Sequence, residues 1–289
     1  GFLGNNIYPL LKDNYSIATI GLALQDNYSA NLAIEIPNLT EKYDIILHAA
    51  GKAHSIPKTE EEKQAFFDVN LQGTKHLCTA LEESGVPKSF IFVSTVAVYG
   101  CDYGDNITEE YPLNGMTPYA LSKIQAEQYL QEWCNKHHVT LGIIRPSLIA
   151  GPNPPGNLGA MINGIRNGKY FSIAGGRARK SVLMVQDIAN LIPLLAEQGG
   201  IYNVCDTYQP TFRELESVIC RQLGKSMPLS IPYWLAKSMA VVGDCLGSKA
   251  PINSLKLNKI TKSLTFSNEK AMRELGWKPM NVLDNFKIE

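Results

Sequence analysis

The sequence has no excess of charge of either sign, because Lys and Arg total 27 and Asp and Glu also total 27. A balanced chain gives no support for binding nucleic acid or another polyanion. No apolar run is long enough to cross a bilayer, so we expect neither a signal peptide nor membrane insertion. The nearest candidate, Ile231 to Leu246, contains Lys237 and Asp244 and is expected to form a buried or packing helix.

Cysteine and histidine are scarce and lack the spacings of disulfide frameworks or metal sites. No Cys-x-x-Cys spacing occurs, and several cysteines fall within apolar segments, so we expect reduced core residues of a cytoplasmic protein. The histidines show no ligand spacing either, and we expect no metal site. The residues concerned are Cys78, Cys101, Cys134, Cys205, Cys220 and Cys245, and His48, His54, His76, His137 and His138.

What the sequence does contain is a tyrosine and a lysine at helical spacing, Tyr119 and Lys123. Side chains four residues apart share one face of a helix, and an ammonium beside a phenol lowers the pKa of the phenol from about 10. Tyr119 would then act as an acid or base near neutral pH, and the Thr95 hydroxyl could orient a substrate alcohol or carbonyl. Thr117 and Pro118 precede the pair as an N-cap residue and a first-turn proline.

The segments around this pair alternate between strand and helix patterns. Continuous apolar runs predict buried strands, and helical patterns separate them at the spacing of βαβ units, so we expect an α/β fold with a doubly wound parallel sheet of the Rossmann type. In such a sheet the active site forms beyond the carboxyl ends of the strands, where Ser94 and Thr95 would lie. Strands are predicted at 15–20, 43–51, 90–100 and 139–146, and helices up to about 12, over 60–84 and from 119.

The length of 289 residues allows a dinucleotide-binding unit and a smaller partner region. After Pro146 the sequence changes to a loop rich in glycine and proline over 151–159, and short elements follow. We therefore predict a dinucleotide-binding region over 1–150. The range 151–289 is predicted to bind mainly substrate, with some segments returning to the sheet.

The opening residues Gly1-Phe2-Leu3-Gly4 look like the second half of a phosphate-binding glycine loop at the start of a helix. The complete fingerprint needs a preceding strand and an earlier glycine. We therefore expect that this sequence lacks the first strand of the natural protein. Without that strand, its two neighbours in the sheet would be exposed and cofactor binding would be weak.

Nearly end to end, these features resemble the extended short-chain dehydrogenase/reductases, in particular the NAD-dependent epimerase/dehydratase family acting on nucleotide sugars. The catalytic pair of that family matches Tyr119 and Lys123, and its Ser-Ser/Thr…Val-Tyr-Gly strand end matches 94–100. Two positions depart from the family pattern, because Ala150 and Lys180 replace a tyrosine and a phosphate-contacting arginine. Further matches are Asn31-Leu32, His48-Ala49-Ala50-Gly51, Asp68-Val69-Asn70, Gly73-Thr74, Arg145-Pro146, Gly151-Pro152, Tyr202-Asn203 and 274–279.

The resemblance implies a role for each matched residue. Tyr119 would be the general acid/base, Lys123 would bind the nicotinamide ribose, and Thr95 would bind the sugar C4 oxygen. Substrate contacts are expected from Thr95, Tyr119, Lys180, Arg179 and Arg177, and cofactor contacts from Gly1, Phe2, Leu3, Gly4, Asn31, Leu32, His48, Ala49, Ala50, Gly51, Asn70, Val93, Ser94, Lys123 and Pro146.

The resemblance also implies a cofactor and partners. NAD is the expected cofactor and NADP is the alternative, because 20–25 contains neither the acid that selects NAD nor an arginine, and Asp26 comes late. A nucleotide sugar is the expected substrate. A homodimer is the assembly common among relatives.

Three functions are open. The first is reduction of a UDP-4-keto-6-deoxy-N-acetylhexosamine by NAD(P)H, the second is 4-epimerisation of a UDP-sugar with tightly bound NAD, and the third is a non-catalytic Rossmann-type binding role. Val96-Ala97 follow Thr95 where a 4,6-dehydratase has an Asp-Glu pair, which argues against dehydration. The segment 251–264 and the turn 175–181 are similar to reductases that make sugars of surface polysaccharides, so we favour the reductase.

Overall fold

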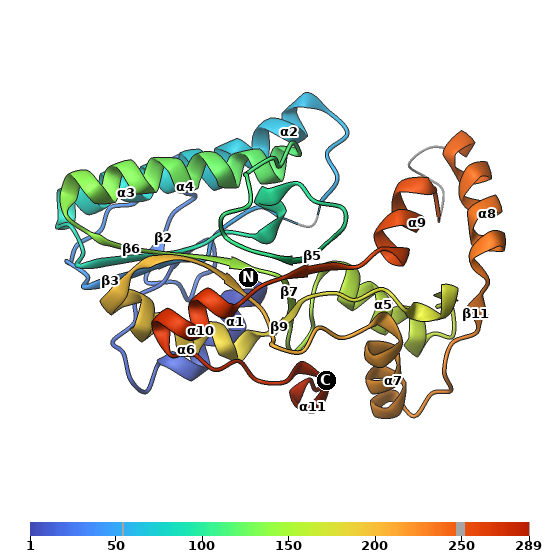
Figure 1. Ribbon diagram of the computed structural model, residues 1–289. Helices are drawn as coiled ribbons and strands as arrows, with labels where there is room; N and C mark the ends of the chain where they lie inside the picture. The colour runs from blue at the N-terminus through green and yellow to red at the C-terminus, as the bar shows by residue number, and fades with distance from the viewer. Residues whose placement is uncertain (54, 247–251, 289) are drawn as a thin grey trace.

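A four-stranded parallel sheet forms the centre of the fold (Figure 1). The computed structural model describes residues 1–53, 55–246 and 252–288. The strands stand in the order β10 (Gly200–Val204), β6 (Thr140–Pro146), β4 (Ser89–Val93) and β3 (Ile45–His48). β4 is buried along its whole length, which is why its sequence is a continuous apolar run and not an alternating one.

Helices cover both faces of this sheet (Figure 1). On one face lie α2 (Glu60–Phe67), α3 (Gly73–Ser84) and α4 (Pro118–His137), and on the other α1 (Phe2–Leu11), α6 (Val185–Gln198) and α10 (Glu269–Leu275). Alternate residues of β4 supply the two cores, because Phe90 and Phe92 pack with α3 and α4 whereas Ile91 and Val93 pack with α6. The doubly wound parallel sheet expected from the sequence is confirmed.

A separate parallel pair is formed by β1 (Ile20–Gly21) and β2 (Tyr28–Ser29). The strand predicted over 15–20 is therefore wrong except at Ile20. At Thr19, just before β1, a side chain replaces a strand as the partner of the backbone donor, because Asn27 Oδ1 accepts a hydrogen bond from Thr19 N at 2.9 Å.

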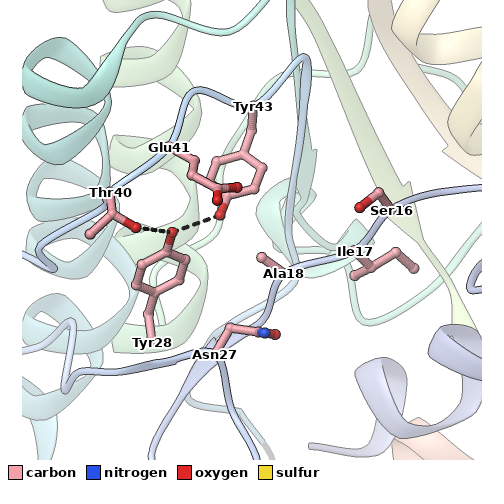
Figure 2. Close-up of a pocket in the computed structure, with 8 residues that line it drawn as sticks. All are labelled: Ser16, Ile17, Ala18, Asn27, Tyr28, Thr40, Glu41 and Tyr43. Carbon is pink, nitrogen blue, oxygen red and sulfur yellow. Dashed lines mark hydrogen bonds between the residues drawn. The ribbon is translucent and has the colours of Figure 1, made fainter.

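A pocket of about 300 Å³ is lined by residues that lead into these strands (Figure 2). In it, Tyr28 Oη is hydrogen-bonded to Tyr43 Oη at 2.7 Å and to Thr40 Oγ1 at 3.1 Å. Residues 16–18 precede β1 and residues 40–43 precede β3, so the pocket lies at the amino-terminal ends of these strands. Ligands of open α/β sheets bind at the opposite, carboxyl ends, and no lining residue of this pocket belongs to the predicted site.

The range 151–289 contributes both to the sheet and to a third core. β10, α6 and α10 complete the sheet and its cover, whereas α5 (Gly156–Arg166), α7 (Phe212–Leu223) and α11 (Val282–Asn285) pack together. The division at residue 150 stays a prediction. Short parallel pairs join distant segments: β7 (Leu148–Ala150) with β9 (Val182–Met184), β5 (Gly104–Ile107) with β12 (Leu264–Phe266), and β8 (Ser172–Ile173) with β11 (Ser230–Ile231).

The helix predicted within 231–246 is present as α8 (Tyr233–Leu246); of the two expectations, a buried helix is wrong and a packing helix is found. Ala236 and Ala240 are buried against Leu257 of α9 (Ser254–Thr261), whereas the larger apolar side chains of α8 are exposed. The apolar composition of a helix predicts that it packs against some apolar surface, but it does not identify that surface. No helix among the described residues has the length and apolar character needed to cross a membrane.

The cysteines follow the expectation with one clear exception. Cys78, Cys134, Cys205 and Cys220 are buried free thiols, and Cys101 is partly buried. Cys245 is exposed, because it stands on the open side of α8. His54 and Pro251, the first residue of the segment likened to reductases, lie outside the described residues.

Candidate active site

β4 brings Ser94 and Thr95 to the carboxyl edge of the sheet. The expectation of one strand over 90–100 is wrong after Val93, because a 3₁₀ helix, η2 (Val96–Tyr99), follows. Thr95 Oγ1 accepts a hydrogen bond from Ala97 N at 3.2 Å and so caps this turn. The cap fixes the Thr95 hydroxyl directly beyond the strand end.

α4 begins as the sequence predicts. Thr117 is its N-cap, and Thr117 Oγ1 accepts a hydrogen bond from Ala120 N at 3.1 Å, while Pro118 occupies the first turn. This start places Tyr119 in the first turn of the helix, where its ring centre lies 6.2 Å from that of Phe66 on α2.

The three predicted catalytic residues meet between α4 and the end of β4. The Thr95 side chain lies close enough to the Tyr119 hydroxyl to lower the pKa of that phenol. One helical turn later, Lys123 Nζ donates to the backbone oxygen of Val93 at 2.8 Å and lies 4.5 Å from the ring centre of Phe92. The catalytic helix is thus fixed to the strand that carries Thr95.

Burial sets the protonation states of these groups. It raises the pKa of Tyr119 above its usual value, and the Thr95 side chain partly opposes this. It lowers the pKa of Lys123 to about 8, against the opposing charge of Glu127. The expected lowering of the tyrosine pKa by the ammonium is not found, because Lys123 directs its ammonium to the Val93 carbonyl. At neutral pH the phenol and the ammonium both keep their protons.

Asn70 is positioned by one wide turn in the helix predicted over 60–84. This turn, η1 (Asp68–Gln72), has the π-helical bonding that is frequent at functional sites. Asn70 Nδ2 donates to Ser122 Oγ at 2.9 Å and to Lys52 O at 3.1 Å, and Asn70 Oδ1 accepts from Lys52 N at 2.7 Å. Because Ser122 directly precedes Lys123, Asn70 ties the loop after β3 to the catalytic helix.

Behind the catalytic residues lies a buried ion pair that sequence reasoning missed. Glu127 accepts hydrogen bonds from Arg145 Nε at 3.1 Å and Arg145 Nη2 at 2.6 Å, and from Ser94 Oγ. Arg145 Nη1 donates to Tyr99 Oη at 3.0 Å. A sequence signal was present, since Glu127 follows Lys123 by four residues on the same face of a predicted helix.

The start of α1 is open to a ligand. A Cβ on Gly1 or Gly4 would have no other atom within 4 Å, and a Cβ on Gly151 would lie 3.5 Å from Phe2 Cζ. The start of α1 therefore lies beside the end of β7, while Leu3 packs into the core. The free N–H groups at a helix N-terminus favour an anion such as a pyrophosphate.

The other predicted cofactor residues lie at the ends of strands or anchor them. Ala49, Ala50 and Gly51 follow β3, and Pro146 ends β6. His48 Nε2 is hydrogen-bonded to Thr74 Oγ1 at 2.9 Å, and burial lowers the pKa of this histidine to about 3, so the ring is neutral. Asn31 and Leu32 follow β2. Leu32 contacts α3, because His76 Nδ1 in that helix donates to Leu32 O at 2.7 Å.

The basic residues expected at the substrate have other partners. Lys180 Nζ donates to Lys262 O at 3.1 Å, Arg179 Nη1 donates to Gln209 O at 2.6 Å, and Arg177 is exposed. No hydrogen bond within the described part of the chain joins any of the three to Thr95, Tyr119 or Lys123. Their contact with substrate phosphates stays a prediction.

Gly51 brings the loop after β3 close to Lys123. A Cβ there would lie 3.1 Å from Asn70 Oδ1 and 3.2 Å from Lys123 Nζ. The small residues at 49–51, the open backbone at Gly1 and Gly4, and the buried ammonium together fit a dinucleotide laid across the carboxyl edge of the sheet. The residues present therefore fit a nicotinamide cofactor.

We expect Gly51→Ala to weaken cofactor binding by about tenfold, because overpacking costs roughly 1–3 kcal/mol and the added methyl group would displace Lys123. Titration of the protein with reduced cofactor, followed by nicotinamide fluorescence, measures this. Gly164→Ala in α5 is the matched control, since the added Cβ would be equally crowded, at 3.1 Å from Tyr170 Cβ. Equal cofactor affinity in both variants would show that Gly51 lies away from the cofactor.

A doubly wound sheet with a tyrosine, a lysine and a threonine hydroxyl at its carboxyl edge is an arrangement suited to a Rossmann-type enzyme that binds a dinucleotide and moves a proton. The match to known proteins is more specific, because residues 1–205 match the family described as NAD dependent epimerase/dehydratase. The chain belongs to this family. It is therefore an NAD(P)-dependent enzyme, and the family expected from the sequence is confirmed.

Individual relatives carry several activities. An N-acetyl-alpha-D-glucosaminyl-diphospho-ditrans,octacis-undecaprenol 4-epimerase from Escherichia coli O157:H7 is 32% identical over 237 residues, which cover 78% of this chain and 70% of the relative. A dTDP-D-glucose 4,6-dehydratase from Mus musculus is 30% identical over 281 residues, covering 95% of this chain and 72% of the relative. A UDP-glucose 4-epimerase from Vibrio cholerae is 26% identical over 321 residues, covering 99% and 91%.

Solved structures share the fold. RMD from Pseudomonas aeruginosa, complexed with NADPH, superposes with a TM-score of 0.71 at 20% identity and covers 98% of this chain and 92% of that one. A UDP-glucuronic acid 4-epimerase from Bacillus cereus, in complex with UDP-glucuronic acid and NAD, gives 0.65 at 17% identity over 84% and 72%. At these identities the likeness supports the architecture alone.

Proposed function

We propose that the protein is an NAD(P)-dependent oxidoreductase that acts at C4 of a nucleotide sugar and reduces a UDP-4-keto-6-deoxy-N-acetylhexosamine. The observation that carries this proposal is the arrangement of Thr95, Tyr119 and Lys123 at the end of β4. A reductase must give a proton to its substrate, and the Tyr119 phenol, whose pKa is raised by burial, holds the proton that this step requires.

The chain's own residues would handle the proton. When bound, the nicotinamide cofactor supplies the hydride that reaches C4 of the sugar. Thr95 Oγ1 would donate a hydrogen bond to the C4 oxygen, and Tyr119 Oη would give that oxygen its proton, so that the ketone becomes an alcohol. Water would then restore the proton of Tyr119, and the Lys123 ammonium, held at the Val93 carbonyl, would bind the cofactor ribose. Neither Val96 nor Ala97 can act as an acid or base, so elimination of water is not supported.

The rest of the site belongs to the same proposal. NAD or NADP would lie along Gly1–Gly4, Asn31, 48–51, Asn70 and the ends of β4 and β6. Lys180, with Arg179 and Arg177, would meet the substrate phosphates. A cytoplasmic location and a homodimer complete the proposal, together with the absence of a nucleic-acid partner.

A 4-epimerase is the second candidate, and the similarity to the relative from Escherichia coli favours it. The same three residues would then move the proton in both directions while NAD stays bound. That relative's substrate is an N-acetylglucosamine carried on a polyprenyl diphosphate, so the second candidate includes a lipid-linked sugar beside a UDP-sugar.

Mixing the purified protein with NADH or NADPH and the UDP-4-keto sugar tests the proposal. We expect stoichiometric oxidation of the cofactor, which is measured as a loss of its absorbance. Interconversion of UDP-sugars or lipid-linked sugars without net cofactor change would replace the reductase by the epimerase. Binding of cofactor and sugar with no turnover would favour the non-catalytic role.

A further inference from the structure

α8 carries an apolar surface that no described part of the chain covers. Its small residues Ala236 and Ala240 are buried against α9, whereas its larger apolar side chains are exposed. In Figure 1, α8 and α9 stand at the end of the molecule away from the sheet. Exposed apolar areas of this kind mark binding surfaces. The α8 surface consists of Tyr233, Trp234, Leu235, Met239, Val241 and Val242, with Leu255 of α9.

The composition of this surface is that of a helix lying in a bilayer interface. Tyr233 and Trp234 combine large apolar rings with a polar atom, and Lys237 follows within one turn. The acid of the helix, Asp244, already accepts hydrogen bonds from Ser254 N at 2.9 Å and Ser254 Oγ at 2.5 Å. With 14 residues, α8 is about 21 Å long, shorter than the roughly 30 Å hydrocarbon core, so it fits on a bilayer and not through it.

Charge selects the kind of surface that α8 can meet. The net charge of zero hides an asymmetry: residues 151–289 contain 17 Lys and Arg against 10 Asp and Glu, and residues 1–150 contain 10 against 17. Within that region, α8, α9 and the residue after α9 carry Lys237, Lys256, Lys259 and Lys262 against the single acid Asp244, a local excess that attracts anionic headgroups. A second copy related by a two-fold axis would set this basic region against itself, which disfavours self-association through α8.

The α8 surface is connected to the substrate side of the site. The residue that follows α9, Lys262, accepts the hydrogen bond from Lys180 through its backbone oxygen at 3.1 Å. Lys259 Nζ in α9 lies 3.6 Å from Asp102, which stands shortly after η2. α9, against which α8 packs, is therefore joined both to Lys180 and to the segment after η2.

We propose that α8 and Leu255 lie in the interface of an anionic bilayer and hold the active site at the membrane surface. A sugar carried on a polyprenyl diphosphate is the class of substrate that this position suits. This choice of substrate rests on the second candidate function, whereas the docking itself rests on the α8 surface.

Flotation of the purified protein with vesicles tests the docking. We expect binding to phosphatidylcholine vesicles that contain phosphatidylglycerol, weak binding to phosphatidylcholine alone, and loss of binding at high salt. Trp234 is 69% exposed while Trp133 and Trp277 are 5% and 3% exposed, so a blue shift of tryptophan fluorescence on binding reports α8. Lys237→Glu should weaken binding at low salt.

The double variant Trp234→Ser, Val241→Ser should lose at least about tenfold in vesicle affinity, because it removes two apolar side chains from the contact. Leu24→Ser, Ile34→Ser is the matched control, since both residues are exposed apolar side chains outside 151–289. A wild-type protein that does not float with anionic vesicles overturns the proposal. So does a dimer in gel filtration that the α8 double variant dissociates, because the cover of α8 would then be a second copy.

Docking and catalysis fail separately in this design. The α8 double variant should turn over a soluble nucleotide sugar as the wild type does, because none of its changes touches the catalytic residues. A protein that floats but turns over no sugar upholds the docking and refutes the proposed function. A protein that turns over sugar but does not float upholds the proposed function and refutes the docking.

Discussion

Replacing Tyr119 by phenylalanine should lower turnover by about 10²–10⁴-fold, which is the contribution of a positioned general acid. The change removes one oxygen and keeps the ring that packs near Phe66. Lys123 keeps its hydrogen bond to the Val93 backbone, so cofactor affinity should change little. The measurement is the maximal rate at saturating cofactor and sugar, with cofactor affinity determined in the same preparation.

Tyr129→Phe is the control for this variant, because Tyr129 lies on the same helix and is partly buried in a core away from Thr95. It should keep the wild-type rate. If Tyr119→Phe stayed within tenfold of the wild-type rate, another group would be moving the proton, and the proposed role of Tyr119 would be wrong.

Replacing Glu127 by glutamine should lower the free energy of unfolding by about 3–5 kcal/mol, the usual result of removing one partner of a buried ion pair. Glu127 and Arg145 are both buried, and glutamine cannot compensate the guanidinium. Burial alone would lower the pKa of Arg145, but the hydrogen bonds and charge of Glu127 raise it, so the arginine stays charged. Thermal and denaturant unfolding measure the loss.

Two further variants separate this cause from a general effect of the substitution. Asp44→Asn breaks an ion pair with Lys88 whose side chains are both largely exposed, and it should leave the free energy of unfolding nearly unchanged. Adding Arg145→Met to Glu127→Gln removes the uncompensated charge and should recover part of the loss. If Glu127→Gln alone were as mild as Asp44→Asn, the buried pair would contribute little to stability.

The same substitution has a second readout. Glu127 opposes the burial effect on Lys123, so its removal should lower the pKa of Lys123 further below about 8. The ammonium would then lose its proton at a lower pH than in the wild type. The decline of turnover at alkaline pH should therefore begin at a lower pH in Glu127→Gln than in the wild type.

The parts of the fold and site that depend on local patterns were predictable from the sequence. The run at 90–93 is apolar without alternation because both faces of β4 are covered. Thr117 and Pro118 fix the start of α4, and the four-residue spacing of Tyr119 and Lys123 fixes their common face.

The parts that depend on tertiary contacts were not predictable. The run from Phe90 to Gly100 looks like one strand because Val98 and Tyr99, in the 3₁₀ turn, are as fully buried as the strand residues. Glu127 and Arg145 come from different elements, and their pairing follows only from the packing of α4 on β6. The apolar residues of α8 show that a helix avoids water, but periodicity does not say what covers it.

The wide turn at η1 is a place where the gene can change in length at small cost to the helix packing. Its bonding runs from Gly73 N to Asp68 O, so this stretch holds one residue more than regular α-helical winding needs. Deleting a single codon there would restore regular winding and keep the turns before and after it in phase. What the deletion would remove is the local widening that presents Asn70 to Lys52 and Ser122. In descendants of this gene, loss of one residue at 68–72 should therefore leave the packing of the flanking helices intact and remove the contacts of Asn70.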